Sequence, residues 1–460
     1  MRRYWAAEEF RSVLRLAAPI AVLQTGMVFY NTAATLFVGR LGPGAIATVG
    51  LAGSTYTLLF ILGLGLLLGI DPISSREFGA GRPKGCAEVL AHAIPLALGV
   101  ALPIFAALSL SGPLFALVGI EPGLAASAAA YLKVLRWCLF PTLLFAACRQ
   151  YLQTMNITRP QLAAVLAGNV LNAALDYGWV FGRLGLPELG VVGAAWAMVA
   201  ANVLMLAVVA AVSWVVARGS GYRFRGFRAP VFAELVRIGL PAGLQLLAEV
   251  GAFACVTMLS GRIGGLATAG HQIALNLASL SFMVPLGVSF AAAVRVGQGI
   301  GARRFRSAAR SGWSALGIGV AFMGLMSAVF VLFPAAVAGL YTQDAATLEL
   351  GRRLLLIVAF FQIFDGTQVV LTGALRGLGE TRIPMAANVV GYWMIGLPVG
   401  GWLAFGKGWG VFGLWIGLCL GLCLVALSLL AAWTHRARRL AKDHPEGPAA
   451  PLSEISELVR

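Results

Sequence analysis

Charged residues are scarce in this 460-residue chain: they make up 11% of it, whereas hydrophobic residues make up 59%. A soluble domain carries about 25% charged residues, so the composition excludes a soluble globular protein. Long runs without a charge recur from end to end, and each can cross the ~30 Å hydrocarbon core of a bilayer. Because these runs are continuously apolar and do not alternate, they predict membrane-spanning helices and exclude a membrane β-barrel.

Cysteine and histidine are also rare, with six and four residues respectively. Most of the cysteines fall inside predicted helices, where a small core-filling side chain is the simplest interpretation. The four histidines show no metal-ligand spacing, and no nucleophile stands beside a base in a predicted span. The sequence therefore predicts no cofactor, no metal site other than one for Na⁺, and no enzyme.

The apolar runs predict twelve membrane-spanning helices, at 14–38, 45–73, 88–113, 128–149, 160–182, 190–216, 234–259, 266–296, 309–338, 351–376, 383–405 and 409–434. The net charge of +16 comes from Lys and Arg residues, most of which fall on one side if the N-terminus is cytoplasmic. This is the positive-inside bias, so we expect both termini in the cytoplasm. The basic charge indicates topology and not nucleic-acid binding.

The two halves of the chain repeat each other. Residues 15–82 align without a gap with residues 237–304, and the identical positions include Arg15/Arg237, Pro19/Pro241, Gly42/Gly264, Gly65/Gly287 and Gly79/Gly301. Each half has an even number of helices, so both enter the membrane from the same side. We expect an all-α membrane protein with an N-lobe at 1–216, a cytoplasmic linker at 217–230, a C-lobe at 231–434 and a cytoplasmic tail at 435–460. A central cleft between two such lobes suits alternating access.

Three acidic residues lie well inside predicted spans: Asp176, Glu249 and Asp365. A charge at the centre of a helix costs about 2.5–3.5 kcal/mol on insertion scales, so a functional role is the default interpretation. Glu249 and Asp365 each lie midway between the two arginines that flank their span, and therefore at equal depth. Such a pair can hold H⁺ or Na⁺ and release it when a cationic substrate competes for the same negative charge.

Amide and aromatic residues accompany these acids. Gln362 and Gln368 fall on one helical stripe with Asp365, and Asn172 lies one turn before Asp176. For Asp176 a structural role in helix–helix contact is the competing interpretation. Aromatic rings can stack on organic cations, although any one of them can also face lipid. The residues predicted to line the substrate cleft are Gln245, Phe253, Phe282, Gln362, Phe364, Gln368 and Tyr392.

Two long stretches, AGHQIALNLASLSFMVPLGVSFAAAVRVGQGIG (269–301) and FDGTQVVLTGALRGLGETRIPMAANVVGYWMIGLPVG (364–400), resemble the multidrug and toxic compound extrusion (MATE) family, in particular its NorM-like branch. The resemblance runs from Pro19 to about Leu418. It implies a monomeric secondary transporter of the bacterial inner membrane that exports organic cations and amphipathic drugs in exchange for H⁺ or Na⁺. A flippase-type carrier of a lipid-linked precursor or metabolite is the alternative, but its cavity would be more basic.

The same resemblance implies which residues couple transport to the cation. A glutamate on helix 7 and an aspartate on helix 10 form the cation site of NorM-like members, and Glu249 and Asp365 match them. Asn172 and Asp176 match an N-lobe pair of the family, whereas Asn31 stands where the family has an acid on helix 1. Because asparagine cannot carry a proton in this pH range, we expect coupling to rest on the C-lobe pair, with the N-lobe residues as a secondary cation or substrate site.

Overall fold

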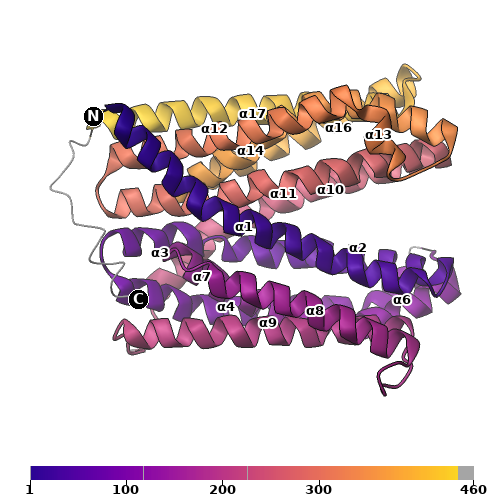
Figure 1. Cartoon of the computed structure of the whole chain (residues 1–460), viewed down its shortest axis with the longest axis horizontal. Helices are drawn as coiled ribbons and strands as arrows, with labels where there is room; N and C mark the ends of the chain where they lie inside the picture. The colour runs from indigo at the N-terminus through magenta and orange to yellow at the C-terminus, as the bar shows by residue number, and fades with distance from the viewer. Residues whose placement is uncertain (1, 118, 225, 444–460) are drawn as a thin grey trace. The chain divides into compact units, whose positions relative to one another are not determined.

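A computed structural model describes residues 2–117, 119–224 and 226–443, and within these ranges every regular element is a helix and none is a strand. Three short elements are not α-helical: η1 is a 3₁₀-helix, and η2 and η3 are π-helices. The elements, labelled in Figure 1 where there is room, are α1 (Arg2–Gly39), α2 (Pro43–Leu67), α3 (Ile70–Gly79), α4 (Pro83–Ser109), α5 (Ser111–Leu117), α6 (Pro122–Leu135), η1 (Arg136–Cys138), α7 (Leu139–Thr154), α8 (Arg159–Phe181), α9 (Val191–Gly219), α10 (Ala229–Ile263), α11 (Gly265–Gly301), α12 (Phe305–Leu332), α13 (Pro334–Gly339), α14 (Ala345–Gly377), α15 (Arg382–Asn388), η2 (Val389–Gly396), α16 (Leu397–Gly401), η3 (Trp402–Gly406) and α17 (Gly410–Asp443).

Ten helical segments of the described chain are long and apolar enough to cross a membrane. Some predicted spans correspond to several consecutive elements, so that 128–149 falls in α6 to α7 and 383–405 in α15 to η3. The two predicted spans outside these ten lie in α1 and α8, which have 38 and 23 residues. Helix α8 is less apolar because it carries Asn169, Asn172 and Asp176. The predicted all-α, multi-span architecture is confirmed.

Contacts divide the described chain into two compact units. The N-lobe unit runs from Thr25 to Gly243, and the C-lobe unit contains Arg2 to Gln24 together with Leu244 to Asp443. The division cuts the first helix of each repeat, since the first part of α1 groups with the C-lobe unit and the first part of α10 with the N-lobe unit. Hydropathy assigns whole helices to a lobe, and the lobe boundaries drawn from it stay a prediction.

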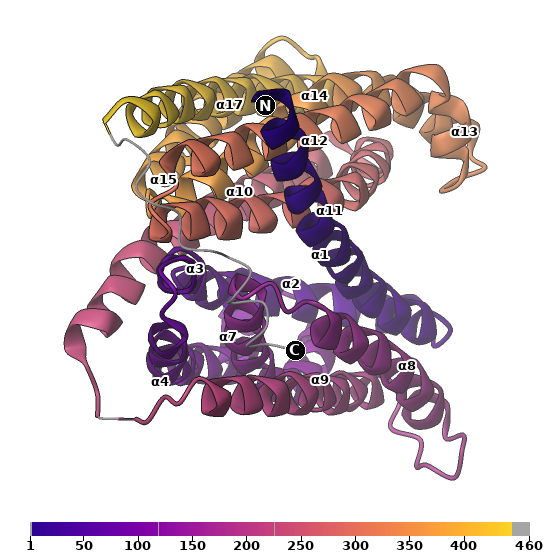
Figure 2. The same cartoon turned by 60° about the vertical axis from the view of Figure 1, so that its left-hand side comes forward.

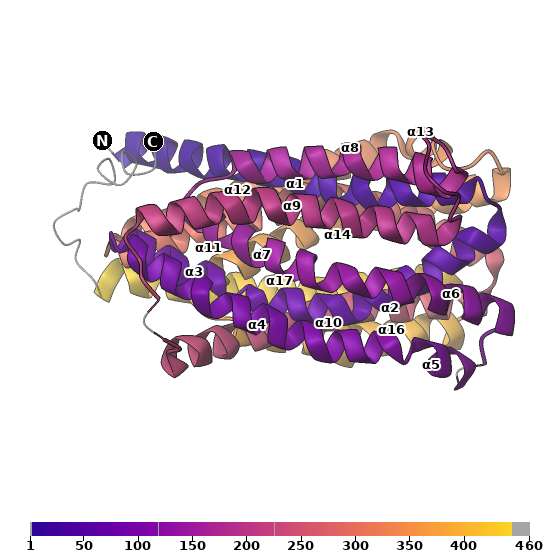
Figure 3. The ribbon, with the colours of Figure 1, turned by 90° about the horizontal axis from the view of Figure 1, so that it is seen from below.

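Each unit is a bundle around a few central helices. In the C-lobe unit, α14 contacts α11, α12 and α17, as Figure 1 shows. In the N-lobe unit, α7 contacts α4 and α9 (Figure 2), and α8 packs along α9 (Figure 3). The buried core of the C-lobe unit includes Leu354, Leu355 and Val358 of α14 against Trp415 of α17. Helix α14 is apolar on several faces, as expected for a helix with neighbours on most sides.

Glycines bring two helices of the N-lobe unit into close contact. A Cβ added at Gly239 of α10 would lie 1.9 Å from the Leu66 carbonyl oxygen of α2, and one at Gly65 of α2 would lie 2.2 Å from the Gly243 Cα of α10. The repeat-related Gly287 of α11 meets α1 in the same way inside the C-lobe unit. Small residues allow this kind of backbone approach, which drives helix association where lipid leaves little hydrophobic driving force.

The predicted linker is fastened to the N-lobe unit. The backbone N–H of Arg228 donates to His92 Nε2 at 2.8 Å, and its guanidinium pairs with Glu88 at 2.7 Å. The ring of Phe227 also packs on His92, with ring centroids 5.4 Å apart. His92 and Glu88 both belong to α4, so the chain before α10 is held against this helix.

The span from α15 to η3 contains two π-helical segments, which the sequence does not predict. Pro398 follows η2 and lacks a backbone N–H, which removes one hydrogen bond of the regular α-helical ladder. Glycines of this span pack closely on α17, where a Cβ at Gly417 would lie 2.3 Å from the Gly400 Cα. π-Helical turns are frequently found at functional sites. Here the segment η2 carries Tyr392 and Trp393.

Candidate functional site

The two predicted C-lobe acids lie together in the C-lobe unit. Glu249 is partly buried on α10, and Asp365 is buried on α14 with 5% of its surface exposed. Their carboxylates are close enough for their charges to interact. Among the described residues, no lysine or arginine forms an ion pair with either carboxylate. The structure therefore brings together two membrane-embedded acids without a basic partner.

Amide groups surround the Glu249 carboxylate. Gln368 of α14 donates to Glu249 Oε2 at 3.3 Å, and Gln245, one turn earlier on α10, donates to the same oxygen at 3.5 Å. Gln368 Oε1 and Thr372 Oγ1 are buried and have no hydrogen-bond partner among the described residues. Buried polar atoms are usually paired, so these oxygens are available to a ligand.

An aromatic cluster adjoins the two acids. Tyr392 of η2 interacts electrostatically with both carboxylates, and its buried hydroxyl has no hydrogen-bond partner in the part of the chain that the structure describes. The ring of Phe253 lies 6.2 Å from Tyr392 and 6.1 Å from Phe361, centroid to centroid. Trp393 Nε1 donates to the carbonyl oxygen of Ala248, which precedes Glu249, at 2.8 Å. The π-helical segment thus holds two aromatic side chains against α10.

Three other predicted cleft residues have different neighbours. Gln362 of α14 donates to the hydroxyl of Ser281 on α11, which ties two helices of the C-lobe unit together. Phe364 pairs with the exposed ring of Phe360, with centroids 5.0 Å apart. Phe282 is partly buried on α11. Among the described residues, no ring contact joins Phe282 or Phe364 to the aromatic cluster, so their predicted role in substrate binding stays a prediction.

A second polar cluster lies in the N-lobe unit around Asp176. Asn172 lies one turn before Asp176 on α8 and donates to Asp176 Oδ2 at 2.7 Å. Both side chains are fully buried, and Asp176 Oδ1 and Asn172 Oδ1 have no hydrogen-bond partner among the described residues. Tyr30 of α1 and Tyr131 of α6 interact electrostatically with Asp176. The side chain of the third predicted N-lobe residue, Asn31, lies outside the described part of the structure.

A hydrogen-bonded network that sequence reasoning missed continues from Tyr30. Asn202 of α9 donates to the Tyr30 hydroxyl at 2.9 Å and to the Met198 carbonyl oxygen at 2.8 Å, and Tyr30 donates to the same carbonyl. Thr142 donates to Asn202 Oδ1 at 3.1 Å. Asn202 is the only asparagine of its span, and a lone amide inside an apolar helix was the signal that could have pointed to it.

The donor sets of both clusters are made of oxygen. No group of three or more His, Cys, Asp or Glu residues that could hold a metal ion occurs in the described chain. Carboxylate, amide and hydroxyl oxygens suit hard cations or a proton.

Comparisons with known proteins agree with this architecture. The family model MatE matches residues 19–178 and 241–402. A probable multidrug resistance protein NorM of Mesorhizobium japonicum is 36% identical and covers 94% of this chain and 95% of its own length. A multidrug resistance protein NorM of Burkholderia vietnamiensis is 39% identical, with 91% and 92% coverage. None of these names is that of an enzyme.

Solved structures give the same fold. An outward-facing multidrug resistance MATE family transporter matches with a TM-score of 0.86 at 22% identity, over 94% of this chain and 97% of that one. A eukaryotic MATE transporter matches with a TM-score of 0.85 at 20% identity, over 95% and 99%. At this identity the likeness shows the fold alone, whereas the family match and the curated relatives extend over most of the sequence. The chain belongs to the MatE family, which is the family that its two motif stretches resemble.

Proposed function

We propose that this membrane protein is a secondary active multidrug efflux transporter, which exchanges an entering H⁺ or Na⁺ for an outgoing organic cation or amphipathic drug. The observation that carries the proposal is the pair of membrane-embedded acids, Glu249 and Asp365, without a basic partner among the described residues. The names of the NorM relatives support drugs as the substrate class.

Neutralisation of this pair explains the need for a coupling cation. Each isolated charge at the centre of a span costs about 2.5–3.5 kcal/mol on insertion scales. Two negative charges that interact with each other add repulsion to this cost, and no side chain among the described residues cancels it by an ion pair. A bound proton or Na⁺ removes the cost, so the site takes up a cation from the side to which it opens.

Competition between cations provides the exchange. An organic cation that binds near Glu249 and Asp365 satisfies the same negative charge, and the rings of Tyr392 and Phe253 offer faces on which it can stack. Gln368 Oε1 and Thr372 Oγ1 supply acceptors for an ammonium group or for Na⁺. Entry of H⁺ or Na⁺ releases the drug, and alternating access carries the two ligands in opposite directions.

The N-lobe cluster is proposed as a secondary cation or substrate site. Asp176 is buried beside Asn172, Tyr30 and Tyr131, with one carboxylate oxygen left without a hydrogen-bond partner among the described residues. With asparagine at position 31, this lobe has one acid fewer than the C-lobe pair. The family resemblance supports the further proposal of a monomer in the bacterial inner membrane. Both termini are proposed to lie in the cytoplasm, because the basic residues follow the positive-inside bias.

The test is transport of ethidium, a fluorescent organic cation, by the purified chain in proteoliposomes with a Na⁺ gradient or a pH gradient imposed separately. Asp365→Asn and Glu249→Gln should each abolish gradient-driven transport, because each removes an acid while keeping the size of the side chain. Glu121→Gln, which neutralises an exposed acid at the start of α6, is the matched control and should transport like wild type.

Two results would contradict the proposal. If both C-lobe variants transport ethidium as well as wild type under either gradient, the coupling role of the acid pair is wrong. If ethidium and other organic cations are not transported and a polyprenyl-linked lipid is, the chain is a flippase-type carrier. One solved structure of the same fold, with a TM-score of 0.86, is described as having a binding pocket of reverse polarity that suggests a different function.

A further inference from the structure

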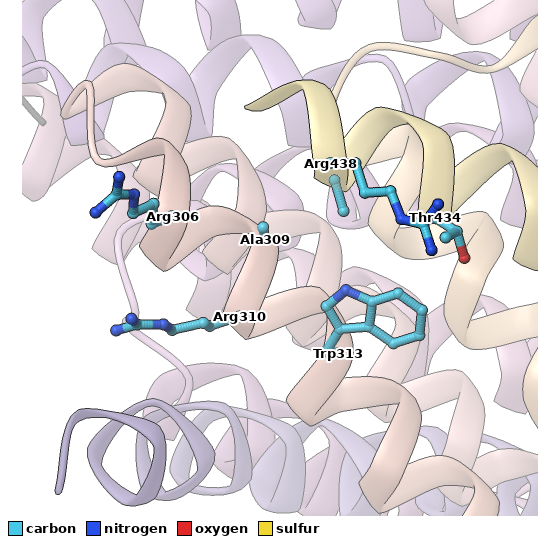
Figure 4. A pocket seen from close by; sticks show the side chains of 7 residues that line it. Arg306, Ala309, Arg310, Trp313, Thr434 and Arg438 are labelled. Carbon is cyan, nitrogen blue, oxygen red and sulfur yellow. The ribbon is translucent and has the colours of Figure 1, made fainter. Parts of the chain in front are cut away.

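A basic pocket lies between α12 and α17 of the C-lobe unit, apart from the acid pair. It has a volume of about 510 Å³ and is lined by Arg306, Arg310 and Trp313 of α12 and by Thr434 and Arg438 of α17. Figure 4 shows the side chains from both helices around it. Three guanidinium groups at one pocket make it a candidate site for an anion.

Among the described residues, the three arginines have no ion-pair partner, because the nearby acids are engaged elsewhere. Glu380 pairs with Arg436 at 2.5 Å, and Glu9 accepts hydrogen bonds from Ser311 at 2.8 Å and from Arg295 at 3.3 Å. Arg306 and Arg438 are exposed and Arg310 is partly exposed. The N-terminus of the 28-residue helix α12, which begins at Phe305, adds a partial positive charge on the same side.

The pocket lies at the ends of two membrane spans, which is the level of the lipid headgroups. Arg306 and Arg310 lie in the first two turns of the span Phe305–Leu332, and Arg438 lies in the last turn of the span Gly410–Leu440. Both helices therefore present their charges where the hydrocarbon core ends. Trp313 follows one turn deeper, is 41% exposed, and makes an edge contact with the fully buried Trp433 at 6.5 Å. Tryptophan is enriched at this level of membrane proteins because its ring is apolar and its N–H is polar.

The positive-inside bias does not by itself explain why three arginines line this pocket. When the gap-free alignment of the two repeats is extended beyond Arg82 and Arg304, Arg306, Arg310 and Trp313 correspond to Lys84, Glu88 and Ala91 of the N-lobe. Glu88 there pairs with Arg228 at 2.7 Å. A general preference for basic residues on one side of the membrane would be met at either repeat. The three arginines around an exposed tryptophan occur only at the C-lobe position of this pair.

We propose that this pocket binds the phosphate of an anionic phospholipid headgroup, such as phosphatidylglycerol. Guanidinium groups match phosphate oxygens with bidentate hydrogen bonds, and three arginines line this one pocket. Basic pockets between spans recognise anionic headgroups in this way. Trp313 lies where the glycerol and upper acyl chain of such a lipid would run. The inference concerns a lipid site on α12 and α17 and does not depend on the drug or coupling ion.

The test is native mass spectrometry of the full chain in detergent, titrated with phosphatidylglycerol, with phosphatidylcholine or with inorganic phosphate. Wild type should retain one phosphatidylglycerol more tightly than phosphatidylcholine. Arg310→Gln and Arg438→Gln should each weaken phosphatidylglycerol binding about fivefold, which corresponds to one basic residue near a membrane surface. Arg439→Gln is the matched control, because the neighbouring arginine is exposed on the same helix but does not line the pocket. It should bind like wild type.

Size-exclusion profiles show whether each glutamine variant is folded. If one of them folds poorly, Arg310→Lys provides the test. Arg310→Lys preserves the charge, so it should keep most of the preference for phosphatidylglycerol over phosphatidylcholine. Equal retention of the two lipids by wild type would overturn the proposal, as would equal losses in Arg438→Gln and Arg439→Gln. Displacement of the bound lipid by inorganic phosphate at equal concentration would show a site for a free anion and would also overturn it.

Discussion

Replacement of Gly239 by alanine tests the close contact of α10 and α2 inside the N-lobe unit. The added Cβ would lie 1.9 Å from the carbonyl oxygen and 2.7 Å from the carbonyl carbon of Leu66. Non-bonded heavy atoms prefer separations of about 3.5–4.0 Å. Because the atoms of Leu66 that it meets belong to the backbone, no change of rotamer can relieve the clash. The two helices must move apart or bend.

The expected cost follows from a comparison on the same helix. Overpacking costs about 1–3 kcal/mol, whereas the change from glycine to alanine in a helix interior favours folding by about 1 kcal/mol. Gly261 is also on α10, and no atom lies within 4 Å of a Cβ added there. Gly261→Ala therefore changes only the helix propensity. The difference in the free energy of unfolding between the two variants isolates the effect of the contact. Gly239→Ala should be less stable than Gly261→Ala by about 1–3 kcal/mol.

Thermal unfolding of the purified proteins in one detergent measures this difference. Gly261→Ala should have the Tm of wild type or a higher one, and Gly239→Ala should have a lower Tm. Gly65→Ala, which would place its Cβ 2.2 Å from the Gly243 Cα, should fall in the same direction as Gly239→Ala. Equal values of Tm for Gly239→Ala and Gly261→Ala would refute the close approach of the two backbones.

Two further predictions concern helix ends. Glu9→Ala should lower the free energy of unfolding by about 1.5–3 kcal/mol, because Glu9 accepts hydrogen bonds from Ser311 and Arg295. Glu8→Ala is the control and should have no effect, because Glu8 is exposed. Equal Tm values for the two variants would contradict this prediction. Hydrogen bonds from Thr347 lower the pKa of Asp344, the N-cap of α14. A lowered pKa means that the ionised cap stabilises the helix above the unfolded-state pKa of about 3.9 and is lost as the pH falls through the lower value. The difference in Tm between wild type and Asp344→Ala should therefore stay constant from about pH 7 to about pH 5 and shrink below about pH 4; its disappearance by about pH 6 would exclude the carboxylate as the cap.

Much of the fold could be predicted because the bilayer restricts the choices. A chain in lipid must satisfy its backbone hydrogen bonds internally, so each long apolar run becomes a helix. The spans predicted around Glu249 and Asp365 lie inside α10 and α14, and the acid pair predicted from equal depth is close enough for electrostatic interaction. Asn172 and Asp176, which the sequence places one turn apart, form a hydrogen bond in the structure. The span limits and the spacing of Asn172 and Asp176 depend on position along one helix, which a sequence records directly.

The features that the sequence did not predict depend on how helices rotate and pack. The network of Tyr30, Asn202 and Thr142 joins α1, α9 and α7, and nothing in the periodicity of one helix indicates that these side chains meet. Gln362 lies on the same face of α14 as Asp365 but donates a hydrogen bond to Ser281, and the ring of Phe364 contacts that of Phe360. A stripe defines a face, whereas the neighbour of that face is set by tertiary packing.

The sequence by itself determined the class of the protein, the approximate limits of most of its apolar helices and its two-fold repeat. Hydropathy and spacing decide these features because the membrane acts on each helix separately. Only the tertiary structure decided the grouping of the first halves of α1 and α10, the π-helical segment that carries Tyr392, and the meeting of Arg306, Arg310 and Arg438 at one pocket. Each of these needs contacts between residues distant in the sequence, and such contacts form only when helices pack.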